Sequence, residues 1–249
     1  MITSTFALTR LAADGARLTI DLPVETGTLE WHGHTRIAAP GLLRAFSLAP
    51  AGHSKAVPTH IFPGGRAETF RRRGYDLRLY EAADRSNSCL IWAGPYHEAT
   101  TWFNGPAPRQ SVLNSLAAAI EFADGPEGAK VTPRLKVGTQ QFGTSVFGIS
   151  DRVLIMALDA RTARESLPDW QGMARGDVEV WKDALALDPE QKAALTGTPY
   201  EWRYTFASPT AVFTVMFPKD GTEAAALRNS RDQAMVDAVL GGVRVEWAA

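Results

Sequence analysis

The sequence is poor in features that mark several large classes of protein. It has one cysteine among its 249 residues, Cys89, so an intramolecular disulfide and a cysteine zinc cluster are both excluded. Its formal net charge is -1, whereas binding to nucleic acid or to an anionic membrane normally needs an excess of Lys and Arg. The sequence therefore predicts neither a nucleic-acid partner nor a membrane partner.

Long apolar runs and phosphate-binding loops are also missing. No stretch approaches the ~18 apolar residues that span a bilayer, and the first residues lack the basic start and apolar centre of a secretory signal. We therefore expect a cytoplasmic protein. The glycine-rich patterns that cradle nucleotides do not occur, and residues 143–148 lack the spacing of a nucleophile elbow. No cofactor is expected.

The chain has ample apolar sequence for a core. Apolar residues make up 45% and charged residues 21%, a balance typical of globular rather than disordered proteins. Alternation of apolar and polar residues, or a short apolar run, predicts strands over residues 17–22, 75–80, 89–93, 200–206, 211–217 and 243–247.

Helical spacing of apolar residues predicts helices over residues 111–119, 178–185 and 222–240. Pro40 is typical of the first turn of a further short helix. Asp188, followed by Pro189 and then by Gln191, resembles a capping box and predicts a helix that Gly197 ends.

The breaker Asp-Gly-Pro-Glu-Gly at residues 124–128 predicts a boundary between two halves, 1–128 and 129–249. Residues 75–78 and 120–122 are echoed, at one common separation, by residues 200–203 and 245–247, which suggests an internal duplication. We expect an α+β fold of two related halves. Each would be a mainly antiparallel sheet packed with one long C-terminal helix and a closing strand, and the second half would carry extra helices.

Both halves end in a similar way. The first closes on L-x-x-x-I-x-F and the second on V-L-G-G-V-R-V, and the chain opens with the strand L-T-I-D-L-P. These apolar patterns resemble the closing helix and strand and the opening strand of Mog1/PsbP-like α/β sandwich modules, arranged in tandem. The resemblance implies a module that binds other proteins and has no enzymatic site.

The motif Trp31-His32-Gly33-His34 is the most site-like. Two histidines two residues apart on a strand point to the same side and can share a metal. No carboxylate follows in residues 35–39 to complete the site. His32 and His34 therefore support an alternative function, a metal-dependent enzyme or small-molecule binder.

Five residues form the predicted partner site. Arg71, Arg72 and Arg73 are the densest positive cluster, which suits a phosphate or an acidic partner, or else a solvated turn that protects a strand edge. Trp31 and Trp102 lie among polar residues, and exposed aromatic side chains favour recognition surfaces.

No catalytic residue is assigned. His97 and Glu98 are adjacent, and neighbouring side chains on a strand point to opposite faces, so they would not act together. The sequence thus predicts a non-enzymatic protein-binding module, such as an adaptor, a chaperone-like factor or an immunity-type factor. A structural subunit of a larger assembly is the remaining alternative.

Overall fold

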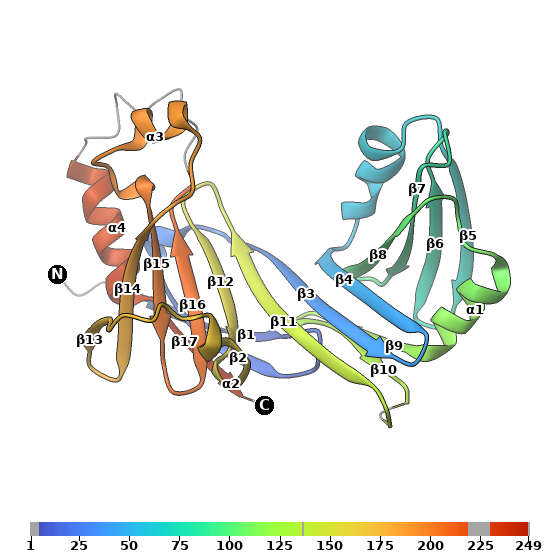
Figure 1. Cartoon of the computed structure of the whole chain (residues 1–249), viewed down its shortest axis with the longest axis horizontal. Coiled ribbons are helices and arrows are strands. Elements are labelled where there is room, and N and C mark those ends of the chain that lie inside the picture. The colour runs from blue at the N-terminus through green and yellow to red at the C-terminus, as the bar shows by residue number, and fades with distance from the viewer. Residues whose placement is uncertain (1–4, 136, 219–229, 249) are drawn as a thin grey trace. The chain divides into compact units, whose positions relative to one another are not determined.

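The computed structural model describes residues 5–135, 137–218 and 230–248 (Figure 1). The chain is mainly β, with 51% of residues in strands and 21% in helices, so the expected α+β class is wrong. It divides into two compact units that are discontinuous in sequence. Unit 1 comprises residues 1–10, 17–31 and 146–249, and unit 2 comprises residues 11–16 and 32–145. This division differs from the expected halves, 1–128 and 129–249.

Unit 2 is built on an antiparallel sheet of six strands in the order β3-β4-β8-β7-β6-β5. The strands are β3 (Glu30–Ala39), β4 (Leu42–Pro50), β5 (Arg66–Arg72), β6 (Tyr75–Glu81), β7 (Asn87–Ala93) and β8 (His97–Asn104). Two short helical turns, η2 (His53–Lys55) and η3 (Val57–Ile61), follow β4. The helix α1 (Gln110–Ala119) leads to a small sheet of β9 (Ile120–Gly125) and β10 (Gly128–Pro133).

The main core of unit 2 lies on one face of this sheet. Alternate side chains of the strands, including Ile37, Phe46 and Trp92, pack with Leu116 of α1 and Val131 of β10. Burying side chains of this size stabilises the fold by roughly 1.5–3 kcal/mol each. The other face is covered only in part, because Val57 and Phe62 pack on Cys89 and Ile91.

Unit 1 contains the strands that run in the order β13-β14-β15-β16-β12-β11 of the 12-stranded sheet, and a second sheet in the order β1-β2-β17. Its strands are β1 (Thr5–Leu11), β2 (Arg17–Pro23), β11 (Gln140–Ile149), β12 (Leu154–Asp159), β13 (Met173–Arg175), β14 (Val178–Ala184), β15 (Trp202–Ala207), β16 (Ala211–Met216) and β17 (Arg244–Ala248). Its helices and helical turns are η1 (Val24–Thr26), α2 (Ala160–Ala163), η4 (Arg164–Ser166), α3 (Pro189–Leu195), η5 (Pro199–Glu201) and α4 (Ser230–Gly242). Boundaries between the units fall inside β1, β3 and β11.

The strand orders of the two units correspond. In each unit a hairpin (β3–β4 or β11–β12) is followed by a four-stranded meander, whose last strand pairs with the second strand of the hairpin. A helix and a closing strand follow, α1 and β9 or α4 and β17. This correspondence matches residues 120–122 with 245–247, as the sequence suggested. It matches β15 with β7 rather than β6, so the echo of residues 75–78 in 200–203 joins strands that are not equivalent.

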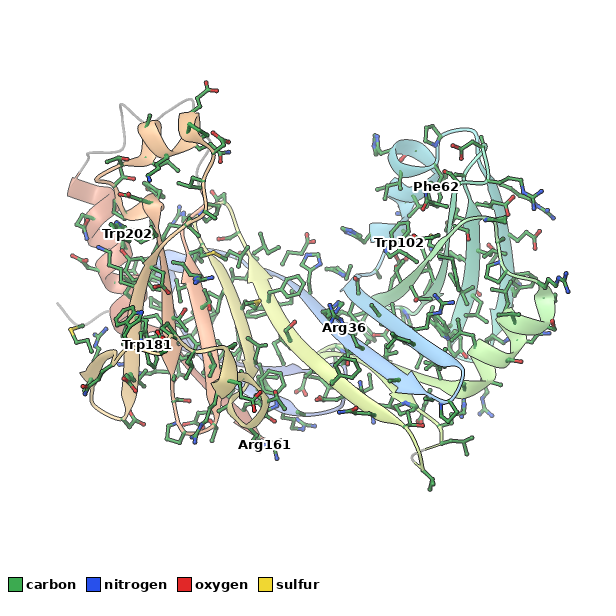
Figure 2. The ribbon with its side chains drawn as sticks, viewed as in Figure 1. Arg36, Phe62, Trp102, Arg161, Trp181 and Trp202 are labelled. Carbon is green, nitrogen blue, oxygen red and sulfur yellow. The ribbon has the colours of Figure 1, made fainter. Side chains whose placement is uncertain are left out.

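The expected long C-terminal helices are wrong. The helix α1 has 10 residues and the described helix α4 has 13, and residues 222–229 of the predicted helix lie outside the described residues. The predicted helix over residues 178–185 is strand β14. Its β-branched and aromatic residues suit a strand paired on both sides, and the Trp181 indole donates to the Trp170 carbonyl over 2.8 Å (Figure 2).

The short helix expected after Pro40 is also wrong, since residues 42–50 form β4. Gly41, with φ of +75°, makes the turn between β3 and β4. The helix predicted at Pro189 is confirmed, and the Asp188 carboxylate accepts from the Gln191 N–H over 2.9 Å. The strands predicted over residues 17–22, 75–80 and 89–93 are confirmed as well.

Candidate functional site

One face of the unit 2 sheet gathers exposed and half-buried side chains from β3, β4 and β8. Directly opposite residues of an antiparallel pair point to the same side. Arg36 lies opposite Ala45, Ser47 lies opposite Thr100, and Trp102 is two residues beyond Thr100 on β8. Leu43 shares the face because it is two residues from Ala45. We call this the Trp102 face: Arg36, Leu43, Ala45, Ser47, Thr100 and Trp102.

The Trp102 face combines apolar and polar side chains and is open to solvent. Trp102 is 43% exposed and Leu43 is 68% exposed, and both Ala45 and Ser47 are exposed. Phe62 supports the indole edge-to-face, with ring centroids 5.9 Å apart (Figure 2). Because Phe62 is itself buried, the Trp102 ring is fixed rather than loosely held. Large exposed apolar side chains grouped on one face are typical of an interaction site.

The Trp102 face carries a positive charge, since Arg36 is exposed and none of its six residues is acidic. His34, the next residue but one before Arg36, lies opposite Ser47 and extends the face. Burial lowers the pKa of His34 below its ordinary value, and the charge of Arg36 lowers it further. His34 is therefore neutral at pH 7, and Arg36 supplies the positive charge.

The two histidines predicted as metal ligands do share this side of β3. The His32 ring packs edge-to-face on His53 of η2, with centroids 5.7 Å apart. In the part of the chain that the structure describes, however, no three His, Cys, Asp or Glu side chains are grouped as a metal site requires. Metal binding by His32 and His34 stays a prediction.

His97 and Glu98 point to opposite faces, as expected. The His97 Nδ1 lies 2.9 Å from the Asp124 Oδ1, and the other oxygen of Asp124 accepts from the Tyr96 and His97 N–H groups. Gly94 makes room for this carboxylate, because a Cβ at Gly94 would lie 2.3 Å from the Asp124 Oδ2. No local sequence pattern points to Asp124, since it lies on β9, far along the chain from β8. The pair ties β9 to the β7–β8 turn.

Glu98 holds η2 on the sheet. Its carboxylate, 3% exposed, accepts from the N–H groups of Gly52 and Ser54 and from the Ser54 hydroxyl, over 2.6–3.1 Å. The Arg78 guanidinium lies 3.2 Å away and completes the set. All of these donors are internal, so the group acts as a structural anchor beside the Trp102 face.

The remaining predicted partner residues are placed apart from Trp102. Arg71 and Arg72 lie on β5, an edge strand, and Arg73 follows in the turn; all three are exposed. Strands β7 and β6 separate β5 from β8. Charged residues on an edge strand discourage pairing with other chains. The position of the cluster on β5 therefore supports its interpretation as solvated charges that protect a strand edge.

Trp31 belongs to unit 1. It lines a pocket of about 440 Å³ together with Phe6, Leu8 and Leu22, and its ring lies against Gly148, where a Cβ would approach to 2.9 Å. The Arg10 guanidinium lies 5.1 Å from the centre of the Trp31 ring. Trp31 is thus partly enclosed and does not contribute to the Trp102 face.

Cys89 is a buried residue under Phe62, as predicted for a small apolar side chain in a strand. Burial raises the pKa of its thiol to about 12, so the thiolate needed for nucleophilic chemistry does not form at neutral pH.

No protein-family model matches the chain, and no curated protein or solved structure shows significant similarity to it. The resemblance to Mog1/PsbP-like modules therefore stays a prediction. Among the described helices, none combines the length and apolar character needed to cross a bilayer.

Proposed function

We propose that this chain is a non-enzymatic binding protein and that the Trp102 face docks a segment of another protein. The observation that carries the proposal is the half-exposed Trp102 fixed on buried Phe62. Tryptophan anchors of this kind supply much of the binding energy at protein interfaces. Trp102 was predicted as a partner residue from the sequence, and Arg36 and Leu43 extend the surface.

The chemistry of the face suggests the partner segment. Leu43, Ala45 and Trp102 offer apolar contact, and Arg36 offers a charged fork that pairs with a carboxylate. The hydroxyls of Ser47 and Thr100 lie side by side in the next row of the face and can bond to polar backbone groups. The segment would carry an apolar or aromatic side chain close to an Asp or Glu.

A peptide-display selection tests this proposal. A random peptide library is selected on the wild-type chain and counter-selected on Trp102→Ala, with Trp170→Ala as the control because Trp170 is a similarly exposed tryptophan in unit 1. We expect peptides that combine an apolar residue with an acidic one, bind Trp170→Ala normally and lose at least about tenfold in affinity for Trp102→Ala.

Two results would count against the proposal. One is a selection that yields peptides insensitive to Trp102→Ala. The other is a set of Trp102-dependent peptides with no acidic residue, whose binding is unchanged by Arg36→Gln; this would remove the partner chemistry argued from Arg36.

A further inference from the structure

A second feature of unit 2 is a polar pocket of about 580 Å³ beside β9 and β10. Its wall includes charged side chains of both signs, Asp14, Glu121, Lys130 and Arg134, together with Thr132 and Gln141. The alternate residues of β9 and β10, such as Phe122 and Val131, are buried in the core. The pocket therefore lies on the outer side of this small sheet.

Pairing between β9 and β10 sets the positions of three of these charges. Glu121 lies directly opposite Thr132, and Lys130 is two residues before Thr132 on the same side of β10. The Arg134 N–H donates to the Ala119 carbonyl over 2.9 Å, which continues the ladder and puts Arg134 on that side too. Glu121 thus has a cationic residue diagonally to each side.

A tight turn brings the fourth charge to the pocket. The Asp14 carboxylate accepts from the Ala16 N–H over 3.0 Å, and the Val131 N–H donates to the Ala13 carbonyl over 2.8 Å. Gly15, with φ of +95°, packs on the aliphatic stem of Lys130, because a Cβ there would lie 3.1 Å from the Lys130 Cδ. Asp14 is therefore held beside Lys130.

The Gln141 side chain closes the wall in a fixed orientation. Its Nε2 donates to the Thr35 hydroxyl over 3.0 Å and to the Val131 carbonyl over 2.9 Å. Over the described ranges, no ion pair joins Asp14, Glu121, Lys130 and Arg134 to each other or to further side chains. Two cationic and two carboxylate side chains thus line one cavity without forming ion pairs with one another.

We propose that this pocket binds a small zwitterion, a free amino acid or a short peptide. The carboxylate of the ligand pairs with Lys130 or Arg134, and its ammonium group pairs with Asp14 or Glu121. Charge-assisted hydrogen bonds of this kind are stronger than neutral ones, and a ligand with both charges uses both halves of the wall. The proposal rests on residues separate from the Trp102 face and does not depend on its function.

Calorimetric titration of the full chain tests the proposal. The probes are triglycine, N-acetyl-triglycine, triglycine amide and glycine. We expect triglycine or glycine to bind, and the acetylated and amidated tripeptides, each of which lacks one charge, to bind at least about tenfold more weakly than triglycine. Binding of glycine but not triglycine assigns a free amino acid, and the reverse assigns a peptide.

Variants connect the binding to the pocket. Lys130→Met and Glu121→Gln should each weaken zwitterion binding at least about tenfold, while Lys55→Met on η2, outside the pocket, should not. Thermal midpoints identify any variant that is not folded. The proposal is overturned if neither zwitterion binds to the folded wild-type chain, if triglycine binds and its two analogues bind as tightly as it does, or if folded Lys130→Met and Glu121→Gln both bind as wild type does.

Discussion

Some side chains of unit 2 accept hydrogen bonds from several donors at once, and Glu98 is the leading example among the described residues. Its carboxylate accepts from two backbone N–H groups and a hydroxyl, with Arg78 beside it. In Glu98→Gln one oxygen becomes an NH₂ group that faces donors. We expect a loss of about 2–4 kcal/mol in the free energy of unfolding, measured in urea.

The control for Glu98→Gln is Glu68→Gln. Glu68 forms an exposed ion pair with Arg66, which contributes at most about 1 kcal/mol. If the two variants lose the same stability, the anchoring role of Glu98 is wrong.

Gly94 is a second position where adding a single methyl group would disturb the packing. In Gly94→Ala the new methyl group would displace the Asp124 carboxylate, which loses its bonds to Tyr96 and His97. We expect a loss of about 2–4 kcal/mol in unfolding free energy. Gly33→Ala is the matched control in the same sheet, because its methyl group would make ordinary contacts at 3.5 Å. A Gly94→Ala variant as stable as Gly33→Ala contradicts the packing described here.

His34 gives a prediction about pH. Its pKa is lowered by burial first and by Arg36 second. An NMR titration of the imidazole should show a midpoint below the ordinary value of 6.5. Arg36→Gln should raise this midpoint and still leave it below 6.5, because burial is the larger cause. A midpoint unchanged by Arg36→Gln, or one raised above 6.5, would contradict these causes.

The same shift has a consequence for stability. The unfolded chain takes up the His34 proton at a higher pH than the folded chain does. The contribution of neutral His34 is therefore fully present above pH 6.5 and is lost as the pH falls from 6.5 through the folded-state pKa. His34→Gln should flatten this part of the curve of unfolding free energy against pH.

At the scale of elements, β5 shows what the arginine cluster does. This edge strand carries Arg66, Arg71 and Arg72, and its paired neighbour is β6. Replacing Arg71 and Arg72 with threonine keeps the strand propensity and removes the charge. We expect the unfolding free energy to change by less than about 1 kcal/mol and self-association to increase, as measured by light scattering at several concentrations. A double variant that remains as monodisperse as wild type would refute the edge-protection role.

Local sequence signals were sufficient for some elements. Strand β2 alternates cleanly, and α3 has the Asp188 cap with Pro189 behind it. They failed for β14, where Val178, Trp181 and Leu185 fall at helical spacing although the segment pairs with β13 and β15. Tertiary pairing overrides a period read from three residues.

The Trp102 face was only partly predictable for the same reason. Trp102 was singled out from its polar surroundings. The apolar pattern after Pro40 predicts a helix over residues 42–46, which hides the cross-strand pairing of β3 with β4, so Arg36 and Leu43 fall outside the predicted site. His97 and Asp124 meet through the contact of β8 with β9, and such non-local contacts leave no pattern in neighbouring residues.

At the scale of the whole molecule, two units with the same strand order share one chain. Strand β16 of unit 1 matches β8, the strand of Trp102, but it has no exposed counterpart of Trp102. Its residues Ala211, Val212, Phe213, Thr214 and Val215 are all buried. The Trp102 face therefore has no counterpart on β16, and we expect substitutions in unit 1 that keep the fold to leave binding at the Trp102 face intact.

The most direct test of the central claim is the affinity of the chain for a protein captured from its native cell. The captured protein is purified and titrated against wild type, Trp102→Ala and Trp170→Ala. The Trp102 face predicts that Trp102→Ala weakens the dissociation constant at least about tenfold, with the thermal midpoint nearly unchanged, and that Trp170→Ala binds as wild type does. Equal affinity of Trp102→Ala and wild type for every captured protein would contradict it.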